Sequence, residues 1–158
     1  MGGELQVVPT PGSAQLLSAS ATAKINATTY LFAAQGGRGG GGTTAWTMSA
    51  DHRLKEAWKN TTPGNTGFYA GGLLFTYNAQ AGGVQVFNAE TGAAVATLQS
   101  GSGHWNSVIV VDNRIALPEG AISGFGGGFG RGRGAAPAPT PAAPATPPSG
   151  IVNIWRLP

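Results

Sequence analysis

The stretch that decides the fold runs from Gly82 to Ser107 and reads GGVQVFNAETGAAVATLQSGSGHWNS. Val84 and Val86 alternate with other residues, and the same period of two returns further along the stretch, as in β-strands. Between the two runs lies NAETG. The side chain of Asn88 can bond the backbone two residues on, and Gly92 takes positive φ without strain. The stretch therefore predicts a β-hairpin, followed by a glycine-punctuated turn and a further apolar strand.

The composition favours an all-β chain. Of 158 residues, 41% are hydrophobic and only 9% charged, with 27 glycines and 11 prolines. Amphipathic helices need charged faces, which so few charges do not supply. There is no cysteine, and the net charge of +3 reflects few acids more than a basic patch. No apolar run reaches the ~20 residues of a membrane span, and no signal peptide is visible at the N-terminus.

A unit of four short strands recurs about every 40 residues, the size of one β-propeller blade. The segment 54–59 is compatible with a helix, but Trp58 and the repeat favour a strand. We therefore predict antiparallel four-stranded blades of a β-propeller, about three of them and an incomplete set. In chain order, the predicted strands are a spare one at 5–8, then 14–19, 28–34, 43–49 and 54–59, then 68–69, 73–78, 84–87 and 95–98, then 108–111, 114–117 and 151–157.

The last unit lacks a fourth strand, and the spare strand at Leu5 to Val8 could complete it. Three blades are too few to close a ring, since propellers have about four to eight. The open sheet edges favour pairing with other chains. The pattern therefore indicates either a fragment of a larger propeller or self-assembly through open sheet edges.

The chain divides into propeller blades over 1–119, an insertion over 120–150 and the closing strand of the last blade over 151–158. The insertion is first glycine- and arginine-rich (FGGGFGRGRG) and then alanine- and proline-rich (AAPAPTPAAPATPP). Neither half can build a core, which predicts disorder. Arg131 and Arg133 beside phenylalanines resemble an RNA-binding tail, but so few charges favour a solvated linker over nucleic-acid binding.

Three segments together resemble the end of bacterial propellers built from PQQ-type repeats: GGLLFTYNAQAGGVQVFNAETGAAVATL, GSGHWNSVIVVDNRIALPEG and GIVNIWRLP. The strand, N/D-A-x-T-G, strand hairpin carries the resemblance. It is similar to two branches, non-catalytic propellers such as the outer-membrane assembly lipoprotein, and quinoprotein alcohol and glucose dehydrogenases. The resemblance implies a periplasmic or extracellular protein. Of the tryptophan docking pattern of such repeats, only Trp58 fits, and Leu98 holds the matching place in the next unit.

The candidate ligand-binding residues are His104, Trp105 and Asn106, a polar and aromatic group at a strand entry. A histidine can act as a base or a ligand, but a structural role is favoured, in which Trp105 packs between blades and His104 hydrogen-bonds a neighbouring loop. Ser107 lacks the elbow motif and orienting acid of a nucleophile. The acids and His52 are scattered along the chain, so no metal site and no catalytic residue is predicted.

These observations favour a non-catalytic PQQ-like propeller scaffold that binds a protein or small molecule on the face carrying the long loops. The alternative is the C-terminal part of a quinoprotein oxidoreductase, with pyrroloquinoline quinone and calcium as cofactors. Under the leading hypothesis no cofactor is expected. No membrane span is expected under either.

Overall fold

The structure, a computed structural model, describes residues 3–10, 19–35, 41–65, 67–78, 83–100, 107–119 and 151–156, and every regular element among them is a β-strand. Sheet 1 consists of β1 (Ala21–Ile25), β2 (Thr28–Gln35), β3 (Gly42–Met48) and β4 (Leu54–Asn60). Sheet 2 consists of β5 (Gly67–Ala70), β6 (Leu73–Asn78), β7 (Gly83–Asn88) and β8 (Ala94–Gln99). Sheet 3 consists of β9 (Ile109–Val111), β10 (Arg114–Glu119) and β11 (Ile151–Arg156).

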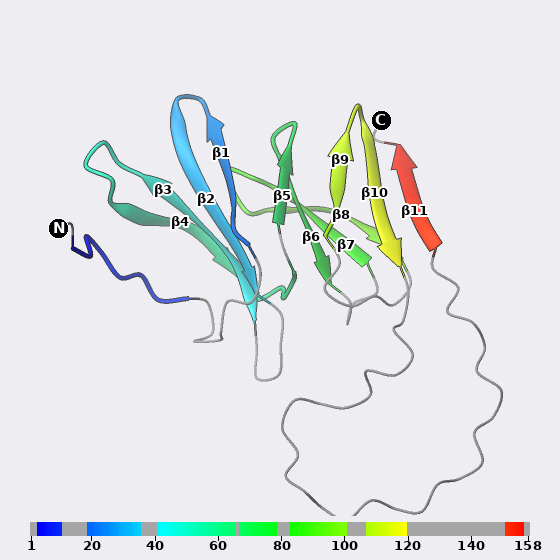
Figure 1. The fold of residues 1–158 in the computed structure, drawn as a ribbon, viewed down its shortest axis with the longest axis horizontal. Coiled ribbons are helices and arrows are strands. Elements are labelled where there is room, and N and C mark those ends of the chain that lie inside the picture. The colour runs from blue at the N-terminus through cyan, green and yellow to red at the C-terminus, as the bar shows by residue number, and fades with distance from the viewer. Residues whose placement is uncertain are drawn as a thin grey trace, which may run out of the picture.

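Each strand pairs antiparallel with its neighbour in the chain, so each sheet is a meander. The first strands of the three sheets lie beside one another, β1 against β5 and β5 against β9. Figure 1 shows the sheets as an open row, with sheet 1 on the N-terminal side and sheet 3 on the C-terminal side. The prediction of an all-β chain with antiparallel four-stranded sheets is confirmed, and the row does not close into a ring.

Two apolar clusters hold the row together, one on each face of sheet 2. Toward sheet 1, Leu74 and Phe87 pack with Phe32 and Ala45. Toward sheet 3, the cluster is larger and contains Phe75, Tyr77, Val84, Val86, Val108, Val110, Ile115 and Leu117. Neighbouring residues of β6 and β7 point to opposite faces, so sheet 2 presents an apolar surface on both sides. Such a sheet is stable only between two others.

The first hairpin of every sheet closes with a two-residue turn in which both residues have positive φ. The turns are Asn26-Ala27, Gly71-Gly72 and Asp112-Asn113. Positive φ at both central positions is the requirement of the type I′ turn, whose twist matches that of the strands it joins. Glycine, asparagine and aspartate are the residues that tolerate this conformation best. The three turns therefore give the sheets a common register.

The hairpin predicted from Gly82 to Ser107 is present, with β7 and β8 joined through Asn88 to Ala93. The Asn88 Oδ1 accepts hydrogen bonds from the backbone N–H groups of Glu90 and Thr91, at 3.0 Å each. Gly92 has φ of +72°. Sheet 1 also contacts this turn. The indole Nε1–H of Trp58 on β4 donates a hydrogen bond to the Ala89 carbonyl oxygen at 2.9 Å.

The Trp58 ring lies against Gly92 and between two other aromatic rings. Its centroid is 6.2 Å from that of Phe32 in its own sheet and 6.4 Å from that of Phe87 in sheet 2. A Cβ atom at Gly92 would stand 2.6 Å from ring atoms of Trp58. Trp58 is thus docked on the turn between β7 and β8 of sheet 2. Leu98 holds the equivalent place, since it pairs with Val84 as Trp58 pairs with Ala45.

The strand predicted at Leu5 to Val8 is wrong, and the strand predicted at 14–19 falls mostly outside the described residues. Leu5 to Val8 forms no strand, because its backbone has no strand partner and the side chains supply its contacts to sheet 1. It also lies beside β4 and not beside β11, so within one chain it does not complete the last sheet. The first strand of sheet 1 is Ala21–Ile25 and not the predicted segment 14–19, most of which lies outside the described residues.

Replacing Gly92 with alanine tests the contact between sheets 1 and 2. Gly92→Ala should lower the free energy of unfolding by about 2–4 kcal/mol, because the methyl group meets the Trp58 ring and the backbone keeps positive φ. In a Trp58→Leu background only the backbone penalty of about 1–2 kcal/mol should remain. Urea unfolding measures both.

The control is Gly3→Ala, since a Cβ atom at Gly3 meets nothing within 4 Å. An equal cost of Gly92→Ala in both backgrounds would contradict the proposed contact.

Candidate functional site

The ligand-binding group predicted from the sequence, His104, Trp105 and Asn106, lies outside the described residues, as does the insertion over 120–150. Ser107, where the description resumes, is exposed ahead of β9. That group therefore stays a prediction, and the functional site has to be sought in the part of the chain that the structure describes.

The end of the sheets that leads to the long loops is recognisable from the strand register. The strands β2, β6 and β10 end at Gln35, Asn78 and Glu119, which pair with the first residues of the following strands. All three are buried polar residues. The amide of Asn153 on β11 donates a hydrogen bond to Glu119 Oε1. The three sheets thus carry buried polar residues at one end, and Figure 1 shows β2, β6 and β10 ending on the same side of the row.

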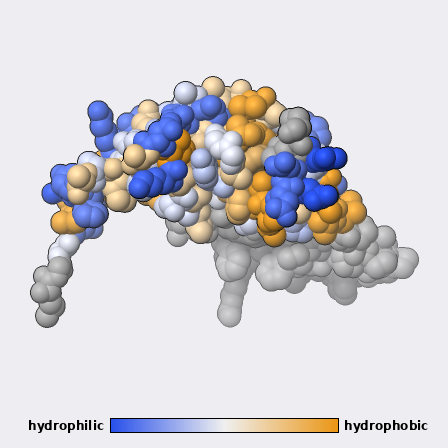
Figure 2. Space-filling model, turned by 90° about the horizontal axis from the view of Figure 1, so that it is seen from above, coloured by the Kyte–Doolittle hydropathy of each residue, from blue (hydrophilic) through white to orange (hydrophobic). Residues whose placement is uncertain are grey.

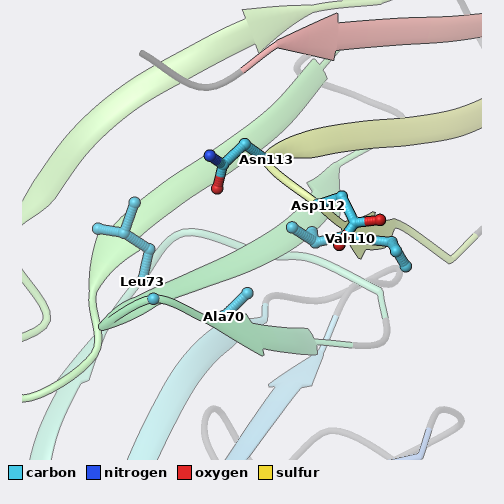
Figure 3. Close-up of a pocket in the computed structure, with 7 residues that line it drawn as sticks. Ala70, Leu73, Val110, Asp112 and Asn113 are labelled. Carbon is cyan, nitrogen blue, oxygen red and sulfur yellow. The ribbon is translucent and has the colours of Figure 1, made fainter.

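The opposite end, which carries the three tight turns, contains an open hollow of about 530 Å³ between sheets 2 and 3. Its lining comes from the first hairpin of each of these sheets. In Figure 3, Leu73 and Ala70 lie on one side, Asn113 lies across the hollow from them, and Asp112 and Val110 line the remaining side. The lining residues are Ala70, Gly71, Leu73, Val110, Val111, Asp112 and Asn113.

The turns that line the hollow exist because of local sequence. At Gly71 and Gly72, with φ of 56° and 80°, a Cβ atom would meet nothing within 4 Å, so this wall is backbone with open space beside it. Across the hollow, Asp112 and Asn113 have φ of 47° and 59°. The second turn therefore brings polar side chains to the same place where the first brings none.

The hollow has an apolar floor and a polar rim. Leu73 and Val110 belong to the cluster between sheets 2 and 3 or pack against it, so they form a firm floor. The Asp112 carboxylate accepts hydrogen bonds, and the Asn113 amide both donates and accepts them. Both residues are exposed. Apolar clefts with a few polar groups are the usual form of small-molecule sites. Figure 2, which views the molecule from above, shows hydrophobic surface on the side of sheet 3, interrupted by strongly hydrophilic residues.

The other candidates considered from the sequence are separate from this hollow. Asp51 and His52 lie in the turn between β3 and β4, on sheet 1. Among the residues that the structure describes, no three histidine, aspartate or glutamate side chains are grouped so that they could hold a metal ion. The hydroxyl of Ser49 donates a hydrogen bond to Asp51 Oδ1 and thereby holds the pKa of that carboxyl below its ordinary value.

The comparisons give no relative from which a site could be transferred: no family model, no curated protein and no solved structure matches the chain. In the described part of the chain, no helix has the length and apolar character to cross a membrane.

Sequence reasoning placed the site at the loop end and missed the hollow at the turn end. The turn dipeptides Gly71-Gly72 and Asp112-Asn113 were visible, since such pairs are typical of two-residue hairpins. What was not visible is that the two hairpins lie side by side, because this depends on how sheets 2 and 3 pack.

The Ser49–Asp51 hydrogen bond predicts a measurable titration change. Ser49→Ala should raise the pKa of Asp51 toward its ordinary value, because the largest interaction that favours the carboxylate is removed. Since the folded pKa is lowered, the contribution of Asp51 to stability is present above the unfolded pKa and is lost as pH falls through the folded pKa. Carboxyl NMR titration of the two proteins checks the shift.

An Asp51 titration curve that does not move in the variant would show that the Ser49 hydroxyl is not its partner.

Proposed function

We propose that the three sheets are blades of a β-propeller of the PQQ-like repeat type, and that the chain is a non-catalytic scaffold that binds a protein or a small ligand. Three features support the propeller: antiparallel meander sheets, first strands that lie side by side, and Trp58 docked on the turn of the next sheet. An exported location and partner binding at the loop end stay predictions of the sequence.

The observation that carries ligand binding is the hollow between the turns of sheets 2 and 3. An apolar floor favours an apolar body of the ligand, and the Asp112 carboxylate at the rim favours a hydrogen-bond donor or a positive charge. We therefore propose a small ligand with an apolar portion and an amino or hydroxyl group, or a protein side chain of the same character. A lysine or arginine presented by a partner has this chemistry.

A titration with phenethylamine tests the hollow. The probe should produce saturable NMR shifts at the backbone amides of Gly71, Asp112 and Asn113. Asp112→Asn should weaken binding by roughly 2–5-fold, as expected for an exposed ion pair worth up to about 1 kcal/mol. Leu73→Trp should abolish the shifts by filling the hollow.

His52→Asn, in a turn of sheet 1, is the matched control and should bind as the unchanged protein does. Benzoate, of similar size and opposite charge, should bind more weakly than the amine. Shifts confined to other sheets, or equal affinities for both probes, would contradict the proposed site.

The quinoprotein alternative calls for a separate experiment. If the chain binds pyrroloquinoline quinone with calcium, the cofactor should quench the fluorescence of its four tryptophans. The described residues offer no cluster of acidic or histidine side chains for the calcium ion. We therefore expect no saturable quenching, and the absence of quenching at saturating quinone and calcium would reject the alternative for this chain.

A further inference from the structure

Sheet 3 differs from the other two sheets in its outer strand and in its outward face. It has three strands in the described part of the chain, so β11 has a free edge where sheets 1 and 2 carry a fourth strand. The face turned away from sheet 2 exposes four β-branched residues, with Ile154 at 66%. They are Ile109, Val111, Val152 and Ile154.

In sheet 2, the residues equivalent to these four are covered by sheet 3. The strands of the two sheets can be aligned from their turns, with Asp112-Asn113 at the place of Gly71-Gly72. The cross-strand pair Ile115–Trp155 then matches the pair Leu74–Phe87. On this alignment Val152 and Ile154 correspond to Val84 and Val86, which are 0% and 3% exposed. Ile109 and Val111 correspond to Phe68 and Ala70, which pack against the same cluster. The outward face of sheet 3 is therefore built to receive another sheet.

The segment 3–10 stands beside sheet 1 as an outer strand of a preceding sheet would. Trp58, on the outer strand of sheet 1, bonds the turn between the third and fourth strands of sheet 2. In the same way, Gln6 exchanges hydrogen bonds with the backbone of Leu54, at 2.9 and 2.7 Å, directly after the corresponding turn of sheet 1. Arg53 of that turn also donates to the Leu5 carbonyl oxygen.

The molecule thus holds the two parts of one more blade at its opposite ends, three strands in sheet 3 and one segment beside sheet 1. Closing the three described sheets of one copy on themselves would give a ring of three blades, below the about four to eight of propellers. Two copies joined head to tail supply six. Interfaces of this kind close into rings when the rotation allows it.

We propose that the outward face and free edge of sheet 3 bind a second copy of this chain, whose segment 3–10 adds to β11 as the fourth strand while its sheet 1 covers Val152 and Ile154. The inference rests on the propeller architecture proposed above. It does not depend on ligand binding in the hollow, with whose lining the outward face shares Val111.

The charged and exposed residues of the chain favour a second copy as the occupant of this face. Arg114 and Arg156 lie directly opposite each other in sheet 3, and like charges in such pairs are destabilising. A strand added antiparallel to β11 brings its first residues to the end of β11, which places Glu4 of the second copy beside Arg156. Leu5 and Val7 are 63% and 75% exposed in one copy. In an added strand they would share one face, with Gln6 on the other.

The test is the mass of the full chain in solution by sedimentation equilibrium over a wide range of concentration. We expect twice the 15.8 kDa mass of one chain. Val7→Asp, in the donated segment, and Ile154→Asp, on the accepting face, should each halve the mass. Val95→Asp is the control, since Val95 is similarly exposed but lies on β8 of sheet 2.

Mixing the two variants separates head-to-tail association from face-to-face association. In a head-to-tail pair the two defects fall on the same interface, so the mixture should recover the double mass through the intact one. If Ile154→Asp loses its β-sheet circular dichroism, Ile154→Thr keeps strand propensity and should still weaken association.

A single-chain mass for the unchanged protein at all concentrations would overturn the proposal, since the face would then be covered by something other than a second copy. So would an Ile154→Asp variant that keeps the double mass, or a mixture that stays at the single mass. None of these results bears on phenethylamine binding, which reports on the hollow within one chain.

Discussion

The two-sided burial of sheet 2 is the constraint on which the rest of the structure depends. Adjacent large residues such as Leu74 and Phe75 point to opposite faces, and both are fully buried. Leaving such a side chain in water costs about 1.5–3 kcal/mol, so neither face tolerates exposure. Sheets 1 and 3 must therefore stack on sheet 2. The adjacency of β1, β5 and β9 and the hollow between the turns both follow from that stacking.

The tight turns shape the hollow that this stacking leaves between sheets 2 and 3. The turns of all three sheets close after two residues with positive φ, so the first hairpins end at a common level. The turn of sheet 2 consists of two glycines, and the turn of sheet 3 consists of an aspartate and an asparagine. The hollow therefore has a bare backbone wall on one side and polar side chains on the other. A change in the length of either turn would shift the strand register and remove this match.

Prediction from the sequence was most successful for elements that depend on contacts between residues close together in the chain. The Asn88 to Gly92 turn was predictable because Asn88 bonds its own backbone and Gly92 takes positive φ. The strand over 54–60 was predictable only from the repeat, since its residues also suit a helix. Leu5 to Val8 was predicted wrongly because strand propensity is realised only against a partner backbone. The strand Ala21–Ile25 was missed because its alanines and lysine are weak strand formers, and the turn at Asn26-Ala27 is what returns it onto β2.

The candidate site was beyond the sequence for a different reason. The residues of the hollow lie some 40 positions apart along the chain, and each hairpin alone is an ordinary turn. Their proximity comes from the cluster of Phe75, Val86 and Ile115, which holds sheets 2 and 3 together. Conversely, His104 to Asn106 were predicted as a site from residue type alone, and residue type does not determine where a side chain lies in the fold.

The two outer faces of the row, one on sheet 1 and one on sheet 3, differ in how much apolar surface they expose. On sheet 1, Trp46 is only 5% exposed although it lies on the face turned away from sheet 2, the side on which the segment 3–10 lies. On sheet 3, the corresponding outward surface is apolar and open. Two identical open faces would pair face to face, but that arrangement leaves Leu5 and Val7 in water and both β11 edges without a strand. A head-to-tail arrangement uses the open face, the free edge and the exposed segment together, so the asymmetry of burial within one chain itself favours one mode of association.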